Sequence, residues 1–103
     1  MIRTLFFATA AISGISTAAL AGGKEVQFDR ASLNEPAYVE ALYAEIEQAA
    51  REVCKSELLG SPYYHSKVRS CIKDSIARAL ADVDSPLLTA FAEGVEEMEL
   101  AAR

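Results

Sequence analysis

Residues 34–54, which read NEPAYVEALYAEIEQAAREVC, carry the clearest structural signal in the chain. Their apolar side chains recur at intervals of three and four residues, the spacing of one face of an α-helix. The start is typical of a helix N-terminus, because Asn34 can cap the first turn and Pro36 occupies a position that needs no N–H. Gly60 and Pro62 predict the end of this helix.

Two further helices are predicted after it. Ser66 can cap a second helix that runs to about Val83, with apolar residues again at helical spacing. Ser85 followed by Pro86 then predicts the start of a third helix. The apolar stripe of this third helix consists of Leu87, Leu88, Phe91, Val95 and Met98. The expected fold class is therefore all-α, a small domain of three helices.

A short extended segment precedes the helices. Residues 24–29 alternate polar and apolar side chains, which places Val26 and Phe28 on one face, as in a β-strand. A single strand needs a partner edge, and the sequence indicates none. We therefore interpret this segment as an extended N-terminal lead that lies against the domain and can pair with another chain.

Residues 1–21 have the pattern of a secretory signal peptide. Arg3 lies before an apolar run, and the small residues Ala19 and Ala21 predict cleavage between Ala21 and Gly22. A membrane anchor is the alternative, but it needs about 20 predominantly apolar residues and this run is interrupted by Ser and Thr. We expect residues 22–103 to form one periplasmic or secreted domain, without stable membrane insertion after cleavage.

Length and charge restrict the function classes. The chain has 103 residues, of which 15 are Asp or Glu and 10 are Lys or Arg, for a formal net charge of -5. This length is sufficient for one small domain. The acidic balance argues against nucleic-acid binding, which needs clustered basic residues. It also argues against adhesion to anionic lipid.

The two cysteines predict a disulfide. Cys54 ends the apolar face of the first helix and Cys71 lies early on that of the second, so a helical hairpin brings them together. In the chain-entropy account, closing a loop of about 15 residues contributes roughly 3 kcal/mol to stability. An even number of cysteines in an exported chain favours this interpretation. Redox catalysis usually uses closely spaced cysteines, and zinc usually takes four ligands.

Other candidate residues are few. Tyr63, Tyr64 and His65 lie together in the connector between the first two helices and form a candidate interaction surface, because aromatic residues concentrate at interface hot spots. No nucleophile or orienting acid is indicated for His65, so we predict no catalytic residue, cofactor or metal site. We interpret the four acidic residues of the third helix, Glu93, Glu96, Glu97 and Glu99, as a solvated face.

The stretch from Val26 to Leu88 resembles the UrcA family of small exported bacterial proteins. The resemblance is carried by Val26–Leu33, by Leu42–Cys54 with its Ala-Ala-x-x-Val-Cys run, and by Cys71–Leu87. Glu45 stands where the family has a basic residue, and Phe28 where it usually has Tyr. The resemblance implies a signal peptide and a helical domain with two cysteines. It implies no established activity.

Two functional hypotheses follow. The first is a non-enzymatic interaction module that binds an envelope or secreted protein, with self-association through the third helix as a further hypothesis. The second is a small-ligand carrier or minor enzyme that uses His65 with neighbouring Tyr or carboxylate groups. The first is favoured because the sequence indicates no catalytic constellation.

Overall fold

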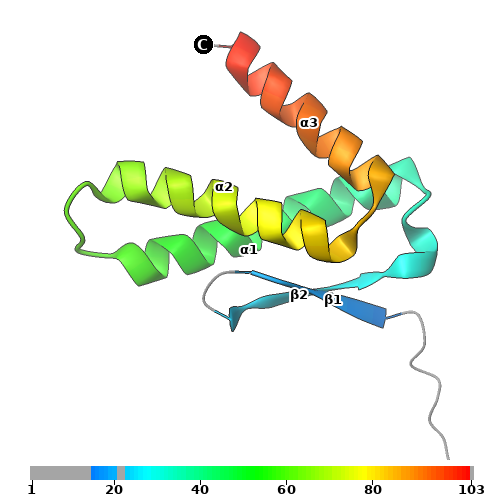
Figure 1. Ribbon diagram of the computed structural model, residues 1–103, viewed down its shortest axis with the longest axis horizontal. Helices are drawn as coiled ribbons and strands as arrows, with labels where there is room; N and C mark the ends of the chain where they lie inside the picture. Colours follow the sequence, from blue (N-terminus) through cyan, green and yellow to red (C-terminus); the bar gives the residue numbers. More distant parts are fainter. Residues whose placement is uncertain (1–14, 21–22, 103) are drawn as a thin grey trace, which may run out of the picture.

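The computed structural model describes residues 15–20 and 23–102. Within them, helices α1 and α2 form an antiparallel hairpin, helix α3 leaves that hairpin at an angle, and a two-stranded sheet lies across one face of it (Figure 1). The elements, in chain order, are β1 (Ile15–Ala19), β2 (Glu25–Asp29), the short 3-10 helix η3 (Arg30–Ser32), α1 (Pro36–Leu58), α2 (Tyr64–Val83) and α3 (Pro86–Ala101).

The three expected helices are present, but the fold is not purely all-α, because the extended lead has a strand partner within the chain. Strand β1 pairs antiparallel with β2, with Ile15 opposite Asp29 and Ala19 opposite Glu25. The alternation of a β-strand turns Ala18 inward, where it is fully buried, and leaves Ile15 59% exposed. This partner strand comes from the segment that the sequence assigns to the signal peptide.

Helix α1 follows the predicted range but not the predicted cap. Its N-cap residue is Glu35 rather than Asn34, and no side chain bonds to the first turn. Pro36 occupies the first helical position, and the Val39 N–H donates to the Glu35 carbonyl at 3.0 Å. The helix ends at Leu58, just before Gly60, whose φ of +83° is one that glycine adopts without strain.

Helix α2 begins two residues before the predicted cap Ser66. The backbone of Tyr63 is left-handed, with a φ of 58°, and its carbonyl accepts the N–H of Lys67 at 3.0 Å. The first turn therefore closes on a backbone carbonyl, and Ser66 lies inside it. The end of the helix at Val83 is as predicted.

Helix α3 starts as the sequence predicts. The side chain of Ser85 accepts the N–H of Leu88 at 3.2 Å, and Pro86 follows at the first helical position. Between α2 and α3, Asp84 has a left-handed φ of 53°, and its N–H donates to the Leu80 carbonyl at 2.9 Å. This pair of bonds ends one helix and starts the next within two residues.

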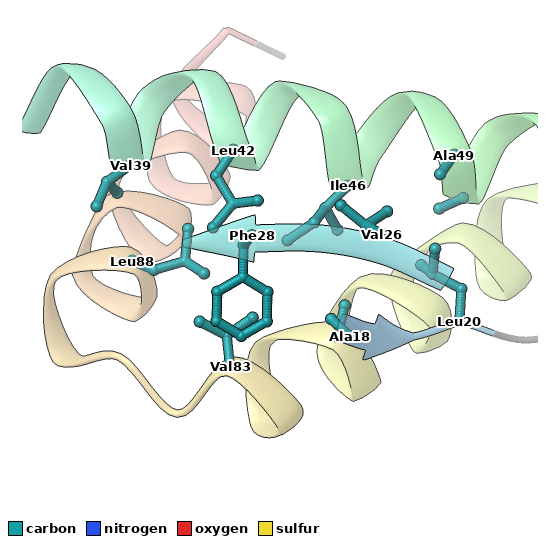
Figure 2. Close-up of a cluster of buried hydrophobic side chains, with 12 residues drawn as sticks. Ala18, Leu20, Val26, Phe28, Val39, Leu42, Ile46, Ala49, Val83 and Leu88 are labelled. Carbon is teal, nitrogen blue, oxygen red and sulfur yellow. The ribbon is translucent and has the colours of Figure 1, made fainter. Parts of the chain in front are cut away.

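One hydrophobic core joins the sheet to the helices. Figure 2 shows Phe28 of β2 pointing between Leu42 of α1, Val83 of α2 and Leu88 of α3. Full burial of a side chain of this size stabilises the folded state by about 1.5–3 kcal/mol. The rest of the cluster consists of Ala18, Leu20, Val26, Val39, Ile46, Ala49, Ala50 and Ala79.

In the described part of the chain, no helix is both long enough and apolar enough to span a membrane.

Candidate functional site

The predicted disulfide is present. Cys54 of α1 and Cys71 of α2 are bonded, with their Cα atoms 5.8 Å apart. Cys54 is fully buried, and its Sγ lies 3.7 Å from the buried hydroxyl of Ser75. Both cysteines of the chain are used in this bond. It therefore leaves neither cysteine as a thiol for nucleophilic chemistry, and it joins the two long helices at the connector end of their hairpin.

The predicted aromatic cluster lies on the surface of that same end. Tyr63 is 83% exposed, His65 is exposed, and Tyr64 is half-buried. The rings of Tyr64 and His65 meet edge to face, with centroids 5.3 Å apart. A catalytic imidazole needs a nucleophile within hydrogen-bond reach and an orienting group. An exposed ring against the edge of a tyrosine offers a contact surface rather than that geometry.

A cleft lies between α2 and α3. Helix α3 packs on α1 at its start, where Leu88 is buried and Phe91 lies edge to face with Tyr43 at 5.5 Å, and its later turns diverge from the hairpin (Figure 1). The cleft has a volume of about 340 Å³. Its apolar lining includes Ile76, Ala77, Leu80, Ala92, Val95 and Leu100, with Tyr43 on the α1 side.

Charges of opposite sign form the two rims of this cleft. Helix α2 contributes Arg69 and Lys73. Helix α3 contributes Glu93, Glu96 and Glu99, and the Lys73 Nζ lies 4.0 Å from a carboxylate oxygen of Glu96. Both partners of this pair are well exposed, so its net contribution to stability is small. The rims therefore present one cationic and one anionic edge to a ligand.

Tyr43 is a neutral hydroxyl in this cleft. Burial raises its pKa above the ordinary value of 10.0, and the carboxylates of Glu47, Glu99 and Glu96 raise it further, against a smaller opposite effect of Arg51. The phenol therefore keeps its proton at neutral pH and can donate or accept a hydrogen bond. A group of this kind binds and orients a ligand, whereas a general base needs a pKa near the working pH.

The sequence did not predict this cleft. The acidic residues interpreted as a solvated face include Glu93, Glu96 and Glu99, which line its rim, whereas Glu97 does not. Tyr63, Tyr64 and His65 lie elsewhere and do not line it. The available signal was Val95, the member of the third helix's apolar stripe that lines the cleft. Met98 of the same stripe is 73% exposed but does not line the cleft.

Two other expectations concern metal binding and the signal-peptide cleavage position. Residues 15–20 and 23–102 contain no group of three His, Cys, Asp or Glu side chains arranged to hold a metal ion. The predicted cleavage position between Ala21 and Gly22 lies outside the described residues. Ala19, two residues before it, is an exposed strand residue, and Leu20 is only 3% exposed.

Comparison with known proteins found no matching family model, no similar curated protein and no similar solved structure. The resemblance to the UrcA family therefore rests on the three sequence pieces alone.

Proposed function

We propose that the protein is an exported, non-enzymatic interaction module of the periplasm or the extracellular space. The observation that carries this proposal is the cleft between α2 and α3, whose apolar lining is open between rims of opposite charge. A disulfide favours an oxidising compartment, because cytosolic thiols are kept reduced. The exported location further rests on the signal-peptide pattern of residues 1–21.

The occupant that best fits the cleft is one amphipathic helix of a partner protein. Such a helix places its apolar face in a groove by residues three and four positions apart. Ile76 and Leu80 on α2 are four apart, and they face Val95 across the cleft. The cationic α2 rim would contact acidic residues of the partner, and the anionic α3 rim basic ones. The opposite charges of the two rims therefore define the orientation of the partner's helix in the cleft.

A charge placed in the cleft should abolish binding of this partner. We propose Val95→Asp, because Val95 is half-buried and lines the cleft, with Ala90→Asp as the matched control, since Ala90 is exposed on the same helix outside it. Each tagged protein is cross-linked in intact cells and purified from the envelope fraction, and circular dichroism checks that both variants are folded.

The expected result is one protein that is retained by the unsubstituted chain and by Ala90→Asp and lost from Val95→Asp. Retention of the same protein by Val95→Asp, or no specific protein at native abundance, would contradict the proposal.

A small-ligand carrier is the second candidate, and the size of the cleft favours it. A volume of about 340 Å³ is at the lower end of the range found for small-molecule sites. The ligand would contact Tyr43 and the apolar lining, rather than His65, which does not line the cleft. Native mass spectrometry of the protein from its producing cells tests this candidate. A bound small molecule that Val95→Asp removes and His65→Ala retains is the expected result.

A further inference from the structure

Strand β1 occupies a groove between β2 and α2. It bonds to the edge of β2 along its whole length and contacts α2 on its other side. Ala18 and Leu20 point into the core beside Val26, as Figure 2 shows. The backbone N–H of Ala19 donates to the Asp82 Oδ2 at 2.9 Å. The groove therefore provides a sheet edge, an apolar floor and a carboxylate that accepts a backbone N–H.

The occupant of this groove comes from the segment that the proposed export would remove. Cleavage between Ala21 and Gly22 takes residues 15–20 away, and with them the only strand that pairs with β2 in the described residues. The edge of β2 then has unpaired N–H and C=O groups, and Val26 and Phe28 lose part of their cover. An open edge beside an apolar surface is a template for another strand.

We propose that in the processed protein this groove binds an extended segment of a partner protein, which replaces β1 as the second strand of the sheet. The proposal rests on the exported state of the proposed function. Main-chain hydrogen bonds to β2 would supply affinity, and alternate side chains would supply specificity.

The resident strand defines the side chains that the groove accepts. Its inward positions hold Ser16, Ala18 and Leu20, and Ala18 is fully buried, so the central inward residue of a partner must be small. Ala19 lies opposite Glu25 on the outward face and also next to Asp82. A basic residue at the position of Ala19 would face both carboxylates. At the end of the strand away from Ala19, the guanidinium of Arg30 donates to the Val83 carbonyl at 3.0 Å. This end of the groove therefore already has a positive charge.

A second copy of this chain fits the groove poorly. In a symmetric antiparallel pair of β2 strands, Phe28 of the other copy would lie opposite Val26, where the groove now holds Ala18. The same register places Glu25 opposite Asp29 of the other copy, and like charges directly opposite each other destabilise a pair. The expected partner is therefore a different protein that carries a small inward residue and a basic outward one.

The experiment uses the protein purified after export with its own leader, and an intact mass identifies its first residue. The probes are three synthetic peptides: residues 15–20 of this chain, the same peptide with Ala19→Lys, and the same peptide with Ala18→Phe. Fluorescence anisotropy measures binding, and hydrogen exchange measures protection of the β2 amides. Two protein variants accompany them: Asp82→Ala removes the acceptor, and Asp74→Ala is an exposed control on the same helix.

We expect a chain that begins at Gly22, binds the unsubstituted peptide and protects the β2 amides. The Ala19→Lys peptide should bind about two- to fivefold more tightly at low salt, as an added cross-strand ion pair implies. The Ala18→Phe peptide should not bind. Asp82→Ala should weaken binding, and Asp74→Ala should not.

The contrary results separate the two proposals. A mature chain that retains residues 15–20 overturns the inference, because the groove stays filled, and it also overturns the predicted cleavage. A chain that begins at Gly22 but binds no peptide, or forms a dimer in its place, overturns the inference alone. If the processed chain has lost helical circular dichroism, the peptide must restore it, and failure to do so also overturns the inference.

Discussion

At the scale of single residues, charge and burial act together on a few side chains. Glu52 illustrates a surface case. A hydrogen bond from Gln48 and the ammonium of Lys24, 3.3 Å away, lower its pKa below the ordinary value of 4.5. The favoured carboxylate form links the segment before β2 to α1 above that pH, and the link weakens as the pH falls through the lowered pKa. Tyr43 illustrates a partly buried case.

The pKa of Tyr43 should fall when a nearby carboxylate is removed. Its folded-state pKa is raised, so its contribution to stability is complete below about pH 10 and is lost as the pH rises through the raised value. Glu47→Gln removes one of the charges that raise it. We expect an alkaline absorbance titration, compared with Tyr43→Phe, to show earlier ionisation of this phenol. Glu45→Gln, at an exposed position of the same helix, serves as the control and should leave the titration unchanged. An equal shift in both variants would show that Glu47 does not specifically raise the pKa of Tyr43.

At the scale of elements, helix starts depend on different groups. Helix α3 uses a side-chain cap, whereas α1 and α2 have none. The difference follows from position, because Ser85 is 5% exposed and Leu88, whose N–H it accepts, is fully buried. An unsatisfied N–H there would cost more than at the exposed start of α1.

Ser85→Ala should therefore destabilise the protein by about 1 kcal/mol, the typical cost of removing a helix cap. Urea denaturation measures it as a lower midpoint with an unchanged slope. Ser70→Ala, an exposed position within α2, serves as the control and should have little effect. Equal midpoints for the two variants would show that the bond to Leu88 does not stabilise α3.

At the scale of the whole molecule, one core and one disulfide hold together the two-stranded sheet, the α1–α2 hairpin and helix α3. The core lies where the sheet, α1, the end of α2 and the start of α3 meet. The disulfide lies towards the connector end of the hairpin. Two surfaces extend from this framework, namely the α2–α3 cleft on one side and the groove of β1 on the other. The cleft can bind a partner without any change in the core, whereas the groove holds Ala18 and Leu20, which belong to the core, so a partner strand there must replace these two side chains.

Removal of either cysteine should lower the melting temperature by a similar amount. Cys54→Ser and Cys71→Ser break the same bond, and a loop of about 15 residues accounts for roughly 3 kcal/mol of stability. Thermal unfolding followed by circular dichroism measures the loss, and the unsubstituted protein under reducing conditions should melt near the two variants. A single variant as stable as the oxidised parent would show that the bond contributes nothing to folding.

Features that depend on local sequence were predictable. The spacing of apolar residues defined all three helices, Ser85 with Pro86 defined the start of α3, and two cysteines on the inner faces of neighbouring helices defined the disulfide. The predicted caps of α1 and α2 were wrong, because the N-cap residues are Glu35 and Tyr63 rather than Asn34 and Ser66, and neither helix has a side-chain cap.

Local sequence was sufficient to predict the helices and the disulfide, because the apolar period lies within each helix and an even number of cysteines in an exported chain favours pairing. The strand that pairs with β2 and the point where α3 separates from α2 became visible in the folded chain alone. Strand β1 lies only a few residues before β2, but the pattern of residues 15–19 also fits an apolar leader, so the sequence did not identify them as the partner strand. The cleft depends on the angle between packed helices, which Leu88 and Phe91 set through contacts that no local pattern encodes.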